Sequence, residues 1–265
     1  MAVYKLSNSG ITTRRSYSSF SAGNEAPVPP LYGNSVVSSG LILHLDAANT
    51  SSYSGSGSTW TDLTGNNNAT LISSPTYETL NTRGFLTFNG TSQYGTIPFS
   101  NSPFRQTSAI TYDVWVKVAT SGGGYVAGTS VSGGQGTGGF GVFTDSAMFT
   151  WTPSNPGSDR SFTNSSPVSF ENTWKHVCVT FNYSTNTKAL YINGSSVSMT
   201  DSGSWTTATP STGYNLSQVD SIAGRYVNSR GYFKGSIAAI KIYNTALSSS
   251  DVTTNFNALK QRFGL

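Results

Sequence analysis

Acidic side chains are the residues of this chain whose spacing bears most directly on catalysis. A glycosidic bond is typically cleaved by two carboxyl groups held about 5 to 9.5 Å apart. Residues i and i+2 of a strand share one face and would place such a pair. The chain has eleven acidic residues, yet no two of them lie within ten residues of each other. We therefore expect no enzymatic activity and assign no catalytic residue, although a pair assembled from two strands stays open.

The two histidines and the single cysteine offer little further chemistry. His44 and His176 lie in strand-like segments, and no metal ligands or triad partners stand beside them in the sequence. Both are predicted to be packed or half-exposed strand residues. Cys178 is predicted to be a small buried residue, and a lone cysteine excludes a disulfide bond within the chain.

Residues 136–141, GTGGFG, match the Gly-x-Gly-x-x-Gly pattern of phosphate-binding loops. That motif requires a following helix, whose N-terminus binds the phosphate. Here a strand-like VFTD follows instead. We therefore predict no nucleotide site, and expect residues 121–141 to form a flexible glycine loop between strands.

The charge and hydropathy of the chain limit the classes of partner that it is expected to bind. The net charge is +4, but charged residues make up only 10% of the chain and the longest basic run is Arg14-Arg15. Nucleic-acid binding needs clustered Lys and Arg, so it is not predicted. No apolar run reaches the length of a membrane span. The first twenty residues contain no apolar core of signal-peptide length, so we expect synthesis in the cytosol and no membrane insertion.

Most of the secondary structure that the sequence predicts is β-strand. Alternating or apolar segments occupy residues 40–47, 83–90, 109–119, 140–144, 148–151, 221–225 and 235–244, and residues 174–194 read as a hairpin. No helix separates them, which indicates antiparallel pairing. A single helix is predicted at residues 248–264, with a capping box from Ser248 to Asp251 and a C-cap at Gly264. We therefore predict an all-β, two-sheet jelly-roll sandwich with one C-terminal helix.

Six segments in order resemble the laminin-G-like jelly roll of the concanavalin A-like lectin/glucanase superfamily. They are LILHLDAAN (41–49), WTDLTGNNNATL (60–71), LTFNGTSQYGTIP (86–98), AITYDVWVKV (109–118), WKHVCVTFNYSTNTKALYINGSSV (174–197) and GYFKGSIAAIKIYNTALSSSDVTTNF (231–256). The resemblance covers about residues 40–265 and implies one domain of that fold. Catalytic members of the superfamily carry Glu-x-Asp-x-Glu or a near variant on one strand, which this chain lacks.

The resemblance also implies a sugar-binding surface built from aromatic side chains. Trp60, Trp115 and Trp174 lie in patterned segments and are predicted to be core residues. The remaining aromatic residues near glycines or irregular stretches are candidate contacts for a glycan or a partner. They are Trp151, Trp205, Tyr125, Tyr214, Tyr226 and Tyr232.

Acidic positions common in the family imply that Asp46 and Asp62 each orient a loop or bind Ca²⁺. Calcium takes six to eight oxygen ligands, often from carboxylates close in sequence, and no such cluster is present. We therefore favour hydrogen bonds to turn amides, and predict no cofactor, with Ca²⁺ as the weaker alternative.

Residues 1–39 differ from the rest, being rich in Ser and Pro, with APVPP at 26–30. This composition predicts an N-terminal arm and a stiff linker. An extended arm can order on a partner's surface. Candidate attachment residues are Tyr4, Leu6, Ile11, Arg14, Arg15, Tyr17 and Phe20.

An arm followed by a jelly roll resembles virion proteins of tailed bacteriophages. This resemblance implies a capsid decoration or a tail or fibre component at the virion surface, in multiple copies. Its partners would be other virion proteins, through the arm, and host-surface glycans. The alternatives are a free-standing carbohydrate-binding module and a glycoside hydrolase with a cross-strand carboxylate pair.

Overall fold

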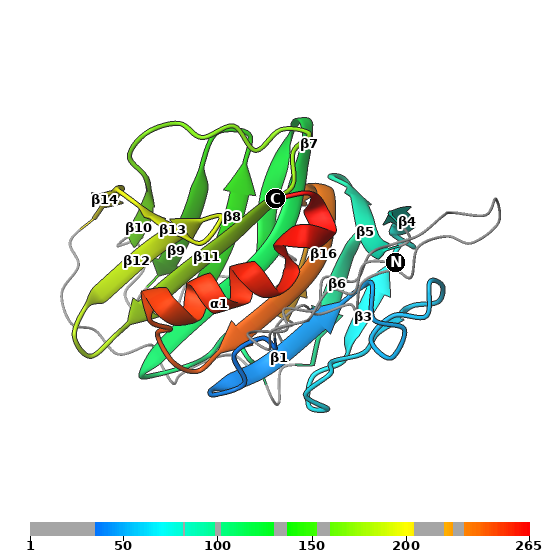
Figure 1. Ribbon diagram of the computed structural model, residues 1–265, viewed down its shortest axis with the longest axis horizontal. Helices are drawn as coiled ribbons and strands as arrows, with labels where there is room; N and C mark the ends of the chain where they lie inside the picture. The colour runs from blue at the N-terminus through cyan, green and yellow to red at the C-terminus, as the bar shows by residue number, and fades with distance from the viewer. Residues whose placement is uncertain are drawn as a thin grey trace, which may run out of the picture. The chain divides into compact units, whose positions relative to one another are not determined.

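The computed structural model describes residues 35–81, 83–98, 102–129, 137–152, 160–203, 220–224 and 231–265. Within them the chain forms the predicted antiparallel jelly-roll sandwich, with two sheets and a helix near the C-terminus (Figure 1). The predicted arm, residues 1–39, falls almost entirely outside these ranges. No helix in the described part of the chain is long and apolar enough to cross a membrane.

The first sheet carries the helix on its outer face. Its strands are β1 (Leu41–Asp46), β4 (Thr76–Leu80), β5 (Arg83–Asn89), β11 (Lys175–Asn182), β12 (Thr187–Ile192), β13 (Ser195–Val197) and β16 (Lys234–Tyr243). Strand β16 pairs with β7 (Ala109–Thr129) along one edge and with β1 and β5 along the other.

The second sheet lies behind the first in Figure 1. Its strands are β2 (Thr59–Trp60), β3 (Ala69–Ile72), β6 (Tyr94–Ile97), β8 (Thr137–Phe143), β9 (Ala147–Thr152), β10 (Arg160–Asn164), β14 (Met199–Ser202) and β15 (Asp220–Ile222). They are ordered β14-β10-β9-β8-β7-β15-β6-β3-β2.

Strand β7 (Ala109–Thr129) belongs to both sheets. Its first part pairs with β11 and β16, and its last part pairs with β8 and β15. Between these parts the chain bends, with a positive φ of 52° at Ser121, 95° at Gly123 and 138° at Gly124. Glycine adopts such angles without a steric cost, so the glycine run lets one strand pass from sheet to sheet.

This bend corrects the prediction of a glycine loop over residues 121–141. Residues 121–129 continue β7 and residues 137–141 begin β8, while residues 130–136 lie outside the described residues. A Cβ atom on Gly122 would lie 2.5 Å from the carbonyl oxygen of Lys234. The glycines therefore permit close backbone packing within a strand. In the sequence alone, such a glycine-rich strand cannot be told from a glycine-rich loop.

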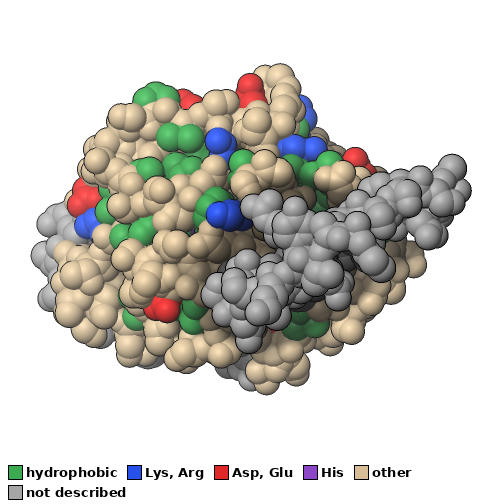
Figure 2. Space-filling model, in the orientation of Figure 1, with side chains coloured by type: hydrophobic (Ala, Val, Ile, Leu, Met, Phe, Trp, Pro, Cys, Tyr) green, Lys and Arg blue, Asp and Glu red, His purple; other side chains and the backbone are tan. Residues whose placement is uncertain are grey.

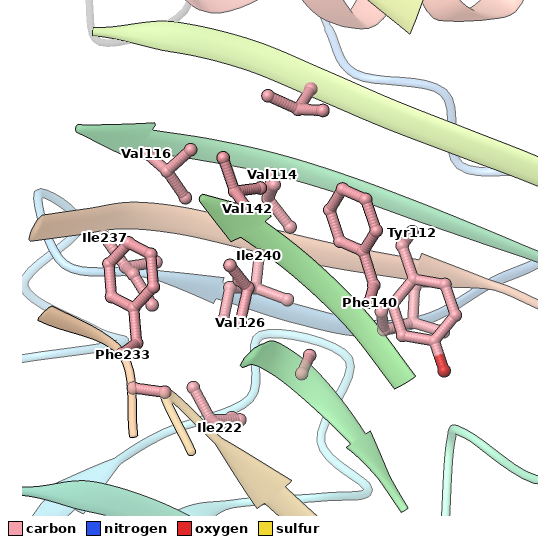
Figure 3. Close-up of a cluster of buried hydrophobic side chains, with 14 of the residues drawn as sticks. Tyr112, Val114, Val116, Val126, Phe140, Val142, Ile222, Phe233, Ile237 and Ile240 are labelled. Carbon is pink, nitrogen blue, oxygen red and sulfur yellow. The ribbon is translucent and has the colours of Figure 1, made fainter. Parts of the chain in front are cut away.

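The core fills the space between the sheets. Figure 3 shows Val114 and Val116 from the first part of β7 in the same cluster as Val142 of β8 and Ile240 of β16. These side chains are fully buried. Trp60, Trp115 and Trp174 are buried as predicted, although Trp115 and Trp174 pack beneath the C-terminal helix, outside the main cluster.

Helix α1 (Ser249–Leu259) begins with the predicted capping box between Ser248 and Asp251. The α-helix ends earlier than predicted and continues as the 3₁₀ helix η2 (Lys260–Phe263), which Gly264 terminates in a left-handed conformation. Tightening of the last turn is common at helix ends. Charged side chains are few and scattered on the face that carries α1 (Figure 2).

Candidate functional site

The outer face of the second sheet carries a row of aromatic rings above glycines. In β8, Phe140 and Val142 point into the core, so strand alternation places Gly139, Gly141 and Phe143 on the outer face. The Phe143 ring lies over Gly141, because a Cβ atom there would come within 2.9 Å of the ring. The missing side chain thus leaves room for an aromatic ring to lie along the sheet.

Tyr125 repeats this arrangement on the neighbouring strand β7. Its ring occupies the space that a side chain at Gly139 or Gly231 would fill, at 3.0 and 2.7 Å from the added Cβ atoms. The Tyr125 ring also lies 6.4 Å from that of Phe143, edge to face. The backbone N–H of Tyr125 donates to the carbonyl of Gly231, so residues 231–232 run alongside β7.

Tyr232 extends the row towards β6. Its ring lies 5.7 Å from that of Tyr94 and 3.0 Å from a Cβ atom added at Gly224. Phe233 points into the core, which leaves Tyr232 on the outer side. We call the four half-buried rings the aromatic face: Tyr94, Tyr125, Phe143 and Tyr232.

A row of small and hydroxyl-bearing residues crosses the same face. Strand register places one such residue from each of eight strands side by side. In order these are Thr70, Thr96, Ser221, Gly128, Gly139, Thr150, Ser161 and Ser202, which we call the hydroxyl row. The Oγ1 atom of Thr150 is buried with no hydrogen-bond partner within the described part of the chain.

The aromatic face and the hydroxyl row contain no charged residue. Tyrosine presents an apolar ring with a polar hydroxyl group, and Ser and Thr hydroxyls both donate and accept hydrogen bonds. Ser221 is buried and its hydroxyl donates to the carbonyl of Gly224, so Ser221, like Thr150, offers no hydroxyl to solvent. The surface is suited to a neutral ligand that has apolar patches and several hydroxyl groups.

The structure places two of the six aromatic residues predicted to contact a ligand on this surface, Tyr125 and Tyr232. Trp151 lies in β9, but its side chain is not among those described, and Trp205, Tyr214 and Tyr226 lie outside the described residues. So do the seven predicted attachment residues of the arm, Tyr4, Leu6, Ile11, Arg14, Arg15, Tyr17 and Phe20.

Sequence reasoning missed Tyr94 and Phe143. A signal for Phe143 was available in the alternation of residues 139–143, GFGVF, where Phe143 occupies the outward position two residues after Gly141. Outward glycines beside an outward aromatic residue indicate a ring lying on the sheet. Tyr94 has no comparable local signal, because its neighbour Tyr232 is distant in sequence.

Asp46 and Asp62 are buried and engaged within the protein. Asp62 accepts hydrogen bonds from the backbone N–H groups of His44, Thr64 and Asn67 at 2.8 to 3.0 Å. Asp46 accepts from Arg262 at 2.8 Å. These bonds hold both carboxylates against neighbouring segments of the protein. The described residues include no group of three or more His, Cys, Asp or Glu side chains that could hold a metal ion.

The histidines and the cysteine are buried, as predicted. Burial raises the pKa of the Cys178 thiol well above its ordinary value, and the carboxylate of Asp113 adds to this effect. The thiol therefore stays protonated and unreactive. The Nε2 atom of His176 donates a hydrogen bond of 3.1 Å to the carboxylate of Asp113, but both side chains are fully buried, so no substrate reaches this pair.

The sandwich of antiparallel strands is a lectin-like fold, and comparison of the sequence with family models agrees with this assignment. A family model named Laminin_G_3, described as the concanavalin A-like lectin/glucanases superfamily, matches residues 89–253. The chain belongs to this superfamily. No curated protein matches it in sequence.

Solved structures with the same fold include two botulinum neurotoxin chains. One is from a study titled as showing that cell entry of botulinum neurotoxin type C depends on interaction with two ganglioside molecules (16% identity, TM-score 0.58). The other is the binding domain of botulinum neurotoxin DC in complex with rat synaptotagmin II (14% identity, TM-score 0.58). Each match covers 82% of this chain and 51% of the toxin chain.

A Trypanosoma rangeli sialidase also matches, with 20% identity and a TM-score of 0.52, over 84% of this chain and 33% of the sialidase. The chain thus spans about half the length of the toxin chains and a third of the sialidase. At these identities the matches show the shared fold.

Proposed function

We propose that this protein is a non-enzymatic virion structural protein, a capsid decoration or a tail or fibre component. Residues 1–39 attach it, and the jelly roll binds glycans through the aromatic face. The observation that carries the glycan proposal is the juxtaposition of Tyr94, Tyr125, Phe143 and Tyr232 with the uncharged hydroxyl row. Membership of a lectin-containing superfamily supports it.

The chemistry of the face matches that of a neutral sugar chain. The C–H faces of a pyranose ring are apolar and pack against aromatic rings, while its hydroxyl groups exchange hydrogen bonds with Ser, Thr and Tyr. The glycines beneath the rings keep the surface shallow, which suits an extended chain. The match to botulinum neurotoxin type C, whose cell entry is dependent upon interaction with two ganglioside molecules, supports a glycan as the ligand class.

A binding role is favoured over hydrolysis by the environment of the carboxylates. Asp46, Asp62, Asp113 and Asp220 are buried, so none is presented to solvent as an acid. The cleft beside β5 and β16 contains one carboxylate, Glu78, among its lining residues. A two-carboxylate mechanism requires a second carboxyl group free to react there, whereas Glu171 at the rim accepts a hydrogen bond from the N–H of Ser121.

The attachment role rests on the composition of residues 1–39 and on the resemblance of the arm-plus-jelly-roll arrangement to phage virion proteins. Deleting residues 1–39 should abolish incorporation into particles and leave a folded domain, measured by particle co-sedimentation and circular dichroism. Incorporation of the truncated, folded domain would contradict attachment by the arm. A full-length chain that never associates with particles would favour the free-standing carbohydrate-binding module.

The glycan role is tested with a glycan array followed by calorimetry on the best ligand. Tyr232→Ala removes the ring and should weaken binding about tenfold or more, whereas Tyr232→Phe keeps the ring and should retain most of the affinity. The same pair at Tyr125 repeats the test on β7. Uniform signal across chemically diverse glycans, or equal affinity in the Ala variants, would contradict the proposal.

A further inference from the structure

A second surface, separate from the aromatic face, lies on the outer side of the first sheet. A cleft of about 320 Å³ opens there, beside the part of the sheet that the helix covers. We call it the lysine cleft. The polar residues that line it include Glu78, Thr87, Lys117, Asn172, Lys234 and Ser236.

Strand register fixes the floor of the lysine cleft. Ser236 of β16 pairs with Thr87 of β5 on one side and with Lys117 of β7 on the other. The three side chains therefore point outward in one row, since directly paired residues share a face of the sheet. The hydroxyl groups of Thr87 and Ser236 lie 3.0 Å apart, which leaves acceptor positions on both for a ligand.

Lys117 and Lys234 bring positive charge into this space. The Nζ atom of Lys117 lies 5.3 Å from the ring centre of Phe85 and 5.5 Å from that of Trp174, so its stem is held against an apolar wall. Lys234 donates to the carbonyl of Thr120 at 3.3 Å. Neither lysine forms an ion pair with a carboxylate of the described residues.

That lack of ion pairs contrasts with other lysines of the domain. Lys188 pairs with Asp201 at 2.8 Å and Lys241 with Asp113 at 2.5 Å. In the lysine cleft two ammonium groups face the single carboxylate of Glu78. The Glu171 carboxylate at the rim accepts a hydrogen bond from the N–H of Ser121. Lys117 and Lys234, which line the cleft without ion-pair partners among the described residues, favour an anionic group on the ligand.

The rim beside Asn172 is held in place. Asn172 has a φ of 54°, a conformation that non-glycine residues adopt rarely and often at functional sites. Its N–H donates to the carbonyl of Val118 and its Nδ2 to Thr120 Oγ1, both at 2.8 Å. Glu171 accepts from the N–H of Ser121 at 2.7 Å. The rim is thus formed before any ligand arrives, which lowers the entropic cost of binding.

We propose that the lysine cleft binds a carboxylated sugar residue. The carboxylate lies between Lys117 and Lys234, and the sugar hydroxyl groups reach Glu78, Thr87 and Ser236. A doubly charged phosphate would be repelled by Glu78, which instead accepts hydrogen bonds from hydroxyl groups. The proposal rests on the proposed function in one respect, namely that the ligand is a sugar. It concerns a different surface and does not involve the aromatic face.

Glucuronic acid and glucose are the matched probes, since they differ in the carboxyl group. Calorimetry or ligand-observed NMR on the full chain should show saturable binding of glucuronate, at least tenfold tighter than glucose and weakened by added salt. Lys117→Gln and Lys234→Gln should each weaken it about tenfold. Lys260→Gln is the control, because Lys260 also lies over a ring, 5.5 Å from the centre of Phe256, outside the cleft.

Several results would overturn the proposal. These are equal affinity for glucose and glucuronate, unchanged glucuronate affinity in the Lys117→Gln and Lys234→Gln variants, or competition by acetate or sulfate as strong as that by glucuronate itself. Tyr232→Ala should leave glucuronate binding unchanged. A protein that binds glucuronate in the cleft but no neutral glycan would refute the role of the aromatic face alone, and the reverse would refute the cleft alone.

Discussion

Asn255 of helix α1 donates a hydrogen bond of 2.9 Å from its Nδ2 atom to the Oδ2 atom of Asp113 in strand β7. The same Nδ2 atom donates to the hydroxyl of Tyr243 at 2.9 Å, and the Oδ1 atom accepts from the N–H of Val37 at 2.9 Å. The hydroxyl of Tyr243 donates in turn to the carbonyl of Val37. One buried amide therefore ties the helix, the first sheet and the segment preceding β1 together.

Asp113 is the centre of this network. Lys241 Nζ lies 2.5 Å from its Oδ1 atom and His176 Nε2 lies 3.1 Å from its Oδ2 atom, with all three side chains fully buried. Burial alone would raise the pKa of Asp113, but the neighbouring Lys241 and His176 outweigh it and hold the pKa well below its usual range. The carboxylate is thus ionised and paired at neutral pH.

Removing one member of this network should be costly. We expect Asp113→Ala to lower the free energy of unfolding by about 3 to 5 kcal/mol, because it leaves the ammonium of Lys241 buried without its partner. The double variant Asp113→Leu/Lys241→Met should recover much of that loss, since apolar residues can replace a buried ion pair at little cost. Urea unfolding followed by tryptophan fluorescence measures both.

An exposed pair provides the control for this comparison. Asp201 is bonded to Lys188 at 2.8 Å, but its side chain is 44% exposed. Asp201→Ala should therefore change stability by no more than about 1 kcal/mol. A loss as large as that of Asp113→Ala, or a double variant no more stable than Asp113→Ala, would show that the buried pair is not the source of the effect.

His44 should make the domain less stable in mild acid. Burial, with help from the charge of Lys241, lowers its pKa from 6.5 to about 4, and its Nε2 atom is buried with no hydrogen-bond partner among the described residues. The unfolded chain binds a proton near pH 6.5, whereas the folded chain resists it down to about pH 4. The contribution of His44 is therefore complete above pH 6.5 and is lost as the pH falls from 6.5 towards 4.

The expected loss of stability follows from the difference between the pKa of His44 in the folded and in the unfolded chain. Unfolding free energy should fall by about 3 kcal/mol between pH 7 and pH 4 through this residue. His44→Leu has no titrating group, so its unfolding free energy should vary less over the same range. Parallel pH profiles of the two proteins in urea titrations would argue against a buried neutral histidine.

The fold could be predicted from the sequence because alternation is local. Residues 109–119 and 174–194 each carry the pattern that sets their pairing faces, and the structure pairs them directly. The polar network could not be predicted, since Asp113 stands on the polar side of its strand pattern and becomes buried only when helix α1 packs over it. Lys241 is likewise a polar residue between two apolar ones.

The candidate site was predictable only in part, because it too depends on contacts between segments that are distant in the sequence. Tyr125 and Tyr232 stand beside glycines in the sequence, which marks them as unusual. That they lie on one face depends on β7 crossing between sheets and on Gly231 running alongside it, which are contacts between distant segments. That Lys117 has no ion-pair partner among the described residues also depends on its surroundings in space, so the sequence gives no signal for the lysine cleft.

The bend of β7 leads to a prediction that separates two roles of glycine, namely tolerance of a positive φ and room for a close neighbour. Gly124 and Gly57 both have positive φ, 138° and 94°, so alanine is strained at either position. A Cβ atom on Gly124 would also lie 2.5 Å from the carbonyl oxygen of Tyr232, whereas one on Gly57 would meet nothing within 4 Å. Gly57→Ala should therefore cost about 1 to 3 kcal/mol of stability from backbone strain alone.

Gly124→Ala should cost distinctly more than Gly57→Ala, because the new methyl group must push residues 231–232 away from β7. The same displacement should weaken glycan binding, since Tyr232 belongs to the aromatic face and Gly124 does not. Urea unfolding and calorimetry on both variants measure the two effects. Equal losses of stability in the two variants, with glycan affinity intact in Gly124→Ala, would mean that β7 and the Tyr232 segment do not pack as closely as the structure has them.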